Sequence, residues 1–167
     1  MSASGLSKQL PNPPTFLEHE KYKGLKFLIF DAPNADNLKE YIELFKKYGV
    51  THVVRTCEHT YSKEVVEREG IKHTDLPYTD GGQPPTEVIS QWREIVHSVR
   101  KQGGTVGVHC VAGLGRAPVL VSIIFIEAGM QPLEAVDFIR QKRRGAINAT
   151  QLKYLRNYKK PGDCNIQ

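Results

Sequence analysis

Residues 105–118 read TVGVHCVAGLGRAP, and this stretch decides the fold. Its first five residues predict a short buried strand, and the apolar residues 116–128 predict a helix. The loop between them contains Gly113 and Gly115. A strand that leads through such a loop into a helix is typical of α/β proteins, whose ligands bind at the carboxyl ends of strands.

Hydrophobic periodicity on either side of this stretch predicts the remaining elements. The expected strands cover residues 25–30, 50–56 and 71–76, and the expected helices cover residues 38–48, 62–69, 88–99, 133–143 and 148–158. Strands that alternate with helices, followed by helices alone, predict an α/β domain. Its central, mostly parallel sheet is flanked by helices.

The chain of 167 residues has the size of one domain. We expect a disordered, proline-rich N-terminal arm at residues 1–15, a folded domain at residues 16–160 and a tail at residues 161–167. The longest apolar run, residues 119–126, is shorter than the roughly 20 residues of a membrane span. The N-terminus lacks the apolar core of a signal peptide, and the three cysteines are irregularly spaced. We therefore expect a reducing, cytosolic environment.

The positive charge of the chain is concentrated near its C-terminus. The net charge is +5, but residues 138–167 contain eight basic residues and one acidic residue, a net charge of +7. Such a cluster suits an anionic partner, either a membrane surface or a nucleic acid, although charge alone favours a solvated helix face. Interleaved aromatic residues suited to base stacking are lacking, so we expect no nucleic-acid partner.

Cys110 follows the predicted strand and lies at the base of the glycine-containing loop. Loop amides and a helix N-terminus can hold an anion, and cysteines in such settings have thiol pKa values of roughly 3.5–7.5. A thiolate can attack phosphorus, and the planar guanidinium of Arg116 matches two phosphate oxygens. The sequence therefore predicts Cys110 as nucleophile and Arg116 as phosphate ligand, with His109 orienting the loop through backbone contacts. The expected phosphate-binding residues are Val111, Ala112, Gly113, Leu114, Gly115 and Arg116.

Two other interpretations of this loop stay open. Cys110 can be a buried apolar cysteine in a turn, because a cysteine and an arginine at this spacing also occur together by chance. A redox or rhodanese-like sulfur carrier also uses a cysteine loop. The histidine, the two glycines and the strand–loop–helix context favour a phosphatase, for which we expect neither a cofactor nor a metal.

The segment HCVAGLGRAPVL, residues 109–120, resembles the signature of the protein tyrosine phosphatase superfamily. More narrowly, it resembles the phosphatases of regenerating liver, the small prenylated type IVA phosphatases. Supporting segments are KYGVTHVVRTCE, DGGQPP and AVDFIRQKRRGAIN. The resemblance implies a dual-specificity-like cysteine phosphatase fold and hydrolysis of phosphotyrosine in proteins through a cysteinyl-phosphate.

The same resemblance implies that Asp80 is the general acid, which then serves as base. Asp75 is the second candidate, and we favour its interpretation as a strand-end aspartate satisfied by nearby backbone. Leu76 stands where the family often has tryptophan, so closure of this loop is expected to differ. Ala117 stands where related phosphatases carry Ser or Thr, which implies slow breakdown of the phosphoenzyme.

A reversible disulfide between Cys57 and Cys110 is also implied by the resemblance. A nearby thiol can capture an oxidised catalytic cysteine before the damage becomes irreversible. The alternative is that Cys57 is an ordinary strand cysteine.

The chain ends Cys164-Asn165-Ile166-Gln167, which fits the prenylation pattern loosely because Asn165 is not aliphatic. A final Gln directs farnesyl, and a basic patch supplies the second membrane signal. We expect attachment to the cytoplasmic face of the plasma membrane or endomembranes, with a cytosolic fraction. The basic residues assigned to this surface are Arg140, Lys142, Arg143, Arg144, Lys153, Arg156, Lys159 and Lys160.

The family also implies a competing function as a binding module. In that interpretation the phosphatase pocket holds an aspartate-bearing loop of a magnesium-transport mediator. Arg143 and Arg144 have a rival use there, because they can border the pocket and contact the acidic loop. A homo-oligomer is a further possibility.

Overall fold

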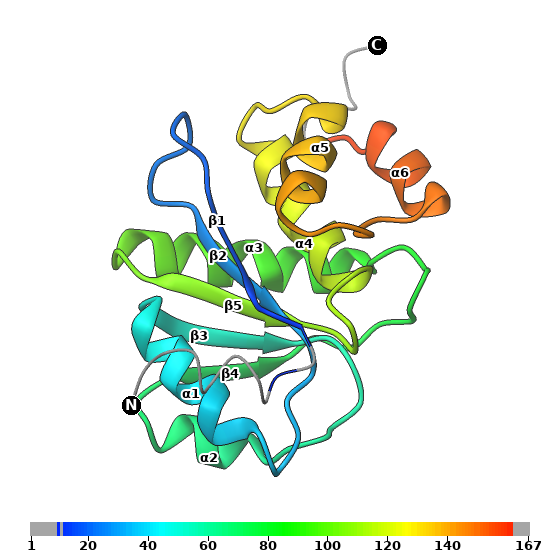
Figure 1. Ribbon diagram of the computed structural model, residues 1–167. Coiled ribbons are helices and arrows are strands. Elements are labelled where there is room, and N and C mark those ends of the chain that lie inside the picture. The colour runs from blue at the N-terminus through cyan, green and yellow to red at the C-terminus, as the bar shows by residue number, and fades with distance from the viewer. Residues whose placement is uncertain (1–9, 11, 162–167) are drawn as a thin grey trace.

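The computed structural model describes residue 10 and residues 12–161, which form a five-stranded sheet covered by helices on both faces (Figure 1). The order across the sheet is β1-β2-β5-β3-β4. Its strands are β1 (Thr15–Glu18), β2 (Lys26–Phe30), β3 (Val50–Arg55), β4 (Lys72–Asp75) and β5 (Thr105–His109). Four of these strands pair in parallel and β1 pairs with β2 antiparallel, which confirms the predicted α/β class.

The sequence did not reveal β1, which begins at Thr15, the last residue of the arm expected at residues 1–15. Thr15 begins β1 and pairs with Ile29, and the side-chain amide of Asn12 donates to Asp31 over 2.8 Å. The prolines that indicated an arm lie just before this edge strand, where a proline interrupts no ladder hydrogen bond. Residues 1–9, 11 and 162–167 lie outside the described part of the chain.

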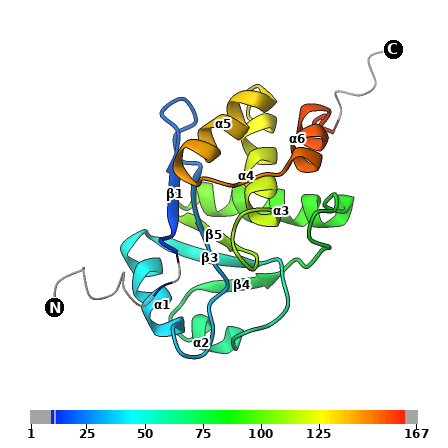
Figure 2. The same cartoon turned by 45° about the vertical axis from the view of Figure 1, so that its right-hand side comes forward.

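Six helices complete the described chain. They are α1 (Leu38–Lys47), α2 (Lys63–Glu67), α3 (Thr86–Lys101), α4 (Arg116–Glu127), α5 (Pro132–Lys142) and α6 (Ala149–Arg156). Side chains of β2 alternate between the faces of the sheet, so Phe27 packs with α3 and α4 whereas Leu28 packs with α1. The two helix layers lie on opposite sides of the sheet in Figures 1 and 2. None of the described helices is long and apolar enough to cross a membrane.

Helix α4 is apolar around its whole circumference and is almost completely buried. Helix α3 packs beside it, where the indole of Trp92 donates to the Leu120 carbonyl over 2.8 Å. An all-round apolar helix is stable only inside a core, so its N-terminus is held in a fixed place beside the sheet.

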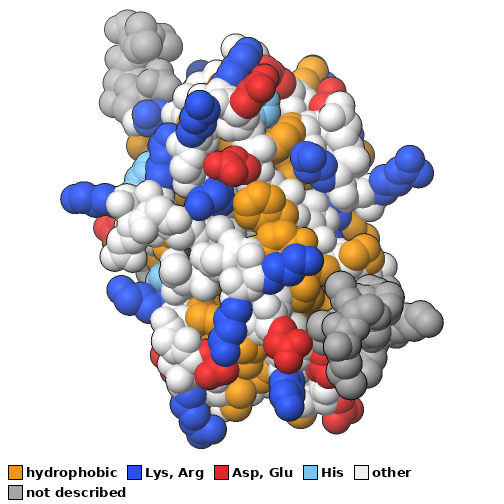
Figure 3. Space-filling model, turned by 60° about the vertical axis from the view of Figure 1, so that its left-hand side comes forward, with side chains coloured by type: hydrophobic (Ala, Val, Ile, Leu, Met, Phe, Trp, Pro, Cys, Tyr) orange, Lys and Arg blue, Asp and Glu red, His pale blue; other side chains and the backbone are white. Residues whose placement is uncertain are grey.

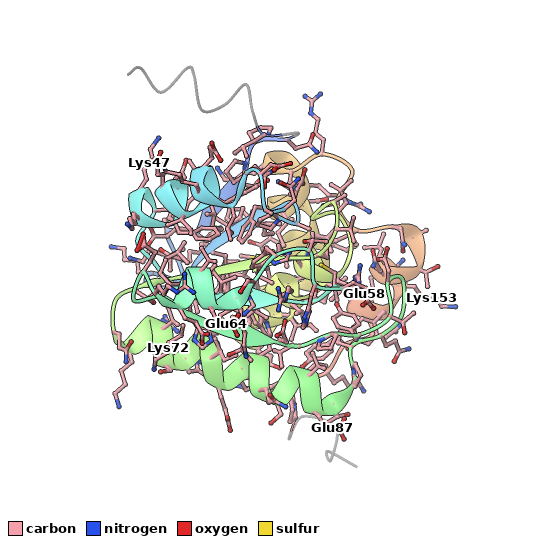
Figure 4. All side chains as sticks on the ribbon, turned by 90° about the horizontal axis from the view of Figure 1, so that it is seen from below. Lys47, Glu58, Glu64, Lys72, Glu87 and Lys153 are labelled. Atoms are coloured by element: carbon pink, nitrogen blue, oxygen red, sulfur yellow. The ribbon has the colours of Figure 1, made fainter. Side chains whose placement is uncertain are left out.

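The parallel strands end in register at one edge of the sheet. His109 at the end of β5 pairs with Phe30 on one side and with Arg55 on the other, and Arg55 pairs with Asp75. In Figure 4, Glu58, which follows β3, and Lys153 of α6 lie on this side, whereas Lys72, which opens β4, lies on the opposite side. The N-terminus of α4 opens at the same edge, which concentrates the predicted site residues there.

Candidate active site

The loop between β5 and α4 turns four consecutive backbone carbonyls outward. Each carbonyl accepts a hydrogen bond from outside the loop: Val111 from the Ala32 amide (2.9 Å), Ala112 and Gly113 from the Arg143 guanidinium (3.1 and 2.8 Å), and Leu114 from the Ile147 amide (2.8 Å). In a trans peptide the next amide points the opposite way, so the amides of residues 112–115 face the interior of the loop. This arrangement is a nest for an anion, and we call residues 110–116 the cradle.

Gly113 is required by the geometry of the cradle. Its φ is +67°, a conformation that side chains disfavour. A Cβ atom there would lie 2.6 Å from Nη2 of Arg143 and 3.0 Å from the Phe30 carbonyl oxygen. Glycine therefore permits both the turn and the close approach of Arg143 from outside.

Cys110 lies buried at the floor of the cradle, directly after β5. Thr56 fixes the strand end, because its amide and its hydroxyl both donate to the His109 carbonyl over 3.1 and 2.9 Å. His109 itself contacts the Cys110 carbonyl through Nδ1 over 3.0 Å, as predicted. The structure thus places Cys110 at the base of the loop whose amides face inward.

Arg116, the first residue of α4, is held by backbone contacts that leave part of its guanidinium free to donate. Its Nη1 donates to the carbonyls of Thr56 (3.1 Å) and Tyr78 (3.2 Å), and the Tyr78 hydroxyl donates to the Arg116 carbonyl (2.9 Å). Its Nε is buried and has no hydrogen-bond partner among the described residues. A buried unpaired donor is costly, so this guanidinium is oriented toward an acceptor that a phosphate supplies.

Asp80 lies at the rim of the cradle with its side chain 71% exposed. Its Oδ1 is 3.8 Å from Nε of Arg116, within ion-pair distance. The amide of Gly82 donates to the Thr79 carbonyl over 3.1 Å, which closes a turn around Asp80. This carboxylate can approach the leaving oxygen of a phosphate that sits on Arg116.

Asp75 occupies a different environment from the one we expected. Its carboxylate pairs with the Arg55 guanidinium over 2.5 and 3.2 Å, so a side chain and not the backbone satisfies it. Burial opposes ionisation, but the hydrogen bonds and charge of Arg55 outweigh it and lower the pKa of Asp75. A carboxylate bound in this way is a poor proton donor, which leaves Asp80 as the candidate acid.

A hollow of about 570 Å³ borders the Asp80 loop. Gly81–Gln83 form one wall, and α6 forms the other through residues that include Gln151, Lys153 and Tyr154. Gln151 is buried and caps α6 together with Asn148. A Cβ atom on Gly115 would lie 3.1 Å from Nε2 of Gln151, so this amide reaches the cradle. Neither Gln151 nor Tyr78 was predicted from the sequence, because their contacts with the cradle and with Arg116 are long-range.

Cys57 lies two residues beyond β3 and is buried beside His109. Its Sγ is 3.8 Å from Nδ1 of His109, and burial raises the pKa of its thiol. Cys57 and Cys110 are both free thiols. Cys164 lies outside the described residues.

Two arginines assigned to the membrane surface are structural. Arg143 is 6% exposed and pairs with Asp31 over 2.9 Å in addition to its bonds to the cradle. Arg140 donates to the carbonyls of Ala146 and Ile147. Figure 3 shows Lys and Arg side chains interspersed with Asp and Glu on one face of the molecule. The other six basic residues are exposed: Lys142, Arg144, Lys153, Arg156, Lys159 and Lys160.

Comparisons with known proteins agree with this geometry. Residues 33–161 match the family "Dual specificity phosphatase, catalytic domain". A probable protein tyrosine phosphatase type IVA A from Dictyostelium discoideum is 50% identical over 167 residues, which cover 98% of this chain and 99% of the relative. Human protein tyrosine phosphatase type IVA 3 is 51% identical over 140 residues, or 83% of this chain and 81% of the relative.

Solved structures resemble the fold closely. A putative protein tyrosine phosphatase from Leishmania major superposes with a TM-score of 0.79 and 37% identity, covering 89% of this chain and all of the other. A kinase associated phosphatase superposes with a TM-score of 0.70 at 20% identity, covering 88% and 93%, and supports the fold alone.

Proposed function

This chain belongs to the protein tyrosine phosphatase type IVA family, and we propose that it hydrolyses phosphotyrosine and similar phosphomonoesters through a cysteinyl-phosphate on Cys110. The observation that carries the mechanism is the cradle. Four carbonyls bonded outward leave inward amides above a buried cysteine. Such amides stabilise both a thiolate and the charge that develops on a transferring phosphoryl group.

In the first step, the Cys110 thiolate attacks phosphorus while the bond from phosphorus to the leaving oxygen breaks. Arg116 binds two phosphoryl oxygens with its planar fork and keeps them bound as charge develops. Asp80, 3.8 Å from this guanidinium, donates its proton to the departing oxygen.

In the second step, water attacks the phosphorus of the cysteinyl-phosphate and its proton passes to the Asp80 carboxylate. The bond between sulfur and phosphorus breaks, inorganic phosphate leaves and the Cys110 thiolate is restored. Ala117 supplies no hydroxyl to this departing thiolate, so we propose that the second step limits turnover.

Phosphoproteins are the proposed substrates, and the hollow between Gly81–Gln83 and α6 is the proposed site for residues beside the phosphotyrosine. Its wall begins at Gly81, the residue after Asp80. None of the described lining residues is acidic, and Lys153 and Lys159 favour an acidic neighbour in the substrate.

Replacement of the nucleophile tests this function. Cys110→Ser should abolish hydrolysis of an aryl phosphate, because a serine hydroxyl at this position is not ionised near neutral pH. Cys57→Ser is the matched control, since Cys57 is also buried, and it should keep its activity in the presence of a reductant. A folded Cys110→Ser protein with undiminished activity would exclude the mechanism.

We also propose that Cys57 protects Cys110 from irreversible oxidation. Peroxide converts a thiolate to a sulfenic acid, and the Cys57 thiol then displaces water to form the disulfide. The position of Cys57 beside His109 supports this proposal. Peroxide should inactivate the enzyme and a dithiol should restore it, whereas Cys57→Ser should recover poorly. A peptide map without the crosslink would contradict the proposal.

Membrane attachment through a farnesyl group on Cys164 is a separate proposal, supported by the terminal sequence and by six exposed basic residues in the last part of the described chain. The surface contribution comes from these six and not from Arg140 or Arg143, which are bound internally. Cys164→Ser should move the protein to the cytosolic fraction of cells. Full membrane binding of that variant would show that another anchor holds it.

The second candidate function is a binding module for an acidic loop of a magnesium-transport mediator. Val111 (62% exposed) and Leu114 (38%) form an apolar rim on the cradle. An exposed apolar rim favours contact with a protein partner over binding of a free phosphate. A carboxylate can occupy the same nest as a phosphate. Val111→Ala adds no charge and keeps the backbone amides of the cradle, so it should weaken partner binding more than it slows hydrolysis of a small aryl phosphate; equal loss of both would argue against a separate binding surface.

A further inference from the structure

Three buried polar side chains link strand β4 to the floor of the cradle. Nε2 of His73 lies 2.8 Å from the Tyr61 hydroxyl, which lies 2.7 Å from Nε2 of His109. Nδ1 of His109 lies 3.0 Å from the Cys110 carbonyl. The series crosses from β4 to β5, and none of its three side chains is more than 8% exposed.

The end of this series at the cradle fixes the position of one proton. A carbonyl only accepts hydrogen bonds, so Nδ1 of His109 must carry the hydrogen that faces the Cys110 oxygen. Burial holds the pKa of His109 down to about 3, so the ring is neutral and its Nε2 carries a lone pair. The Tyr61 hydroxyl must therefore donate to that Nε2.

The end of the series at β4 is consistent with this direction. Because the Tyr61 hydrogen is used on His109, the Tyr61 oxygen can only accept from Nε2–H of His73. Nδ1 of His73 is then the unprotonated nitrogen, and it is buried without a hydrogen-bond partner among the described residues. The reverse tautomer would bury an unpaired N–H instead, and unpaired buried N–H groups are rarer than underused acceptors.

We propose that His73 is a positioning residue for the phosphatase reaction, acting through Tyr61 and His109 on the Cys110 peptide. In this direction, every N–H and O–H group of the series points from its donor toward the cradle. The dipoles therefore add, and their positive ends point toward Cys110. A neutral series of donors thus directs a small positive potential toward Cys110, at a depth where burial prevents a charge on His109.

The last bond of the series acts on the cradle itself. With its carbonyl fixed on His109, the peptide between Cys110 and Val111 directs its N–H to the other side, toward the anion. Hydrogen bonds in series strengthen one another by roughly a tenth to a third each. We therefore expect the contribution of His73 to be a modest adjustment of rate and of thiolate formation, on the order of threefold.

The charged groups around the series explain why it stays neutral. The Arg55 guanidinium lies 4.7 Å from the centre of the Tyr61 ring and also donates to the Tyr61 carbonyl over 2.8 Å. Asp75 pairs with Arg55 and partly offsets its effect on His73. The other charged or titratable groups that act on His73 are Lys63 of α2 and His52 of β3. Burial and the charge of Arg55 lower the pKa of His73 to about 4.

The test compares the same substitution on two neighbouring strands. His73→Leu removes the donor to Tyr61, and His52→Leu removes a histidine that bonds Thr74 over 2.8 Å and has no bond to the series. His73→Gln keeps an Nε2 donor. The measurements are kcat/KM for an aryl phosphate and the pH of half-maximal Cys110 alkylation by iodoacetamide, read on the Cys110 peptide by mass spectrometry.

We expect His73→Leu to raise that pH and to lower kcat/KM roughly threefold. His73→Gln should restore both values, and His52→Leu should change neither. In a double-mutant cycle, His73→Leu should have little further effect once Tyr61→Phe has interrupted the series. Equal effects of His52→Leu and His73→Leu, or additive effects of His73→Leu and Tyr61→Phe, would overturn the proposal.

The effect on activity rests on the proposed role of Cys110, whereas the direction of the series does not. Nitrogen NMR of the histidine rings in the unaltered protein reads the tautomers directly. The expected result is an Nδ1–H tautomer for His109 and an Nε2–H tautomer for His73. The opposite tautomers would overturn the inference even if Cys110 is the nucleophile, and this measurement decides the matter if His73→Leu fails to fold.

Discussion

The cradle, residues 110–116, and the acid loop, residues 77–83, meet at one edge of the sheet but are held differently. The cradle carbonyls bond to Ala32, which follows β2, and to Arg143 and Ile147, which follow α5. The acid loop is fixed at its base by the contacts of Tyr78 with Arg116, whereas the turn around Asp80 is closed within the loop itself. The proposed phosphate-binding element is therefore held by distant parts of the fold, and the proposed proton donor is held by local contacts.

This difference matches the two tasks. Electrostatic stabilisation of a transition state requires donors that do not reorganise during the reaction, so long-range anchoring is an advantage. A general acid must approach each substrate and later a water molecule, which a loop with local contacts can do. Substitutions in the two loops should therefore differ in kind: cradle changes should affect activity and stability together, and acid-loop changes should affect activity alone.

The largest effect is expected at Arg116, where the cradle meets the acid loop. Arg116→Lys keeps the charge but loses the planar fork and the paired donors. We expect kcat/KM for an aryl phosphate to fall by about 10³-fold or more. Affinity for tungstate, measured by inhibition or calorimetry, should fall with it. Retention of more than a tenth of the activity would show that bidentate binding is unimportant.

The next largest effect is expected at Arg143, which holds the cradle in place from outside. Arg143→Met removes two hydrogen bonds to cradle carbonyls and three to neighbouring groups, and it leaves buried Asp31 without its charged partner. Breaking a buried pair typically costs about 3–5 kcal/mol, so urea unfolding should show a loss of this size together with reduced activity. Arg144→Met is the matched control and should change stability by less than about 0.5 kcal/mol, because Arg144 is exposed. Equal stabilities of the two variants would contradict the anchoring role.

The acid loop should respond in the opposite way. Asp80→Asn should slow hydrolysis of a phosphate with a poor leaving group by about 10²-fold or more, since the oxygen then departs unprotonated. Activated aryl phosphates should be less affected in the first step. Stability in urea should stay within about 0.5 kcal/mol, because Asp80 is 71% exposed. A large loss of stability would mean that the acid loop is anchored as firmly as the cradle.

The smallest effect is expected from Ala117→Ser, at the boundary between the cradle and α4. A hydroxyl there can donate to the departing thiolate, and one donor to developing charge contributes at most about 10²–10³-fold. Because Ala117 is fully buried, packing should reduce this gain, and we expect steady-state turnover to rise roughly severalfold. Pre-steady-state kinetics would show a smaller burst; an unchanged burst and rate would mean that breakdown of the phosphoenzyme is not limiting.

The sequence predicted most elements and the cradle because both are local. Helix periodicity and the order of His109, Cys110 and Arg116 depend only on neighbouring residues. The structure added the contacts between residues that are far apart in the sequence. Asp75 bonds Arg55 of the neighbouring strand. Because this pairing makes Asp75 a poor proton donor, it favours Asp80 as the general acid.

Arg143 shows more strongly that composition alone does not predict the role of a charged residue. In the sequence it is one of eight basic residues that predict a membrane surface, yet it is 6% exposed and anchors the cradle. Its partner Asp31 is more than a hundred residues away in the chain. The connection of His73 to His109 is likewise invisible in the sequence, because Tyr61 links them from the loop between β3 and α2.

Trapping the phosphoenzyme tests the central claim most directly. Asp80→Asn protein is mixed with an activated aryl phosphate and quenched in acid, and its peptides are analysed by mass spectrometry. Without the base for the second step, the intermediate should accumulate, and one phosphoryl group should be found on the Cys110 peptide and be absent from Cys110→Ser protein. Release of the aryl group without phosphoryl on Cys110, or with phosphoryl on another residue, would contradict the account.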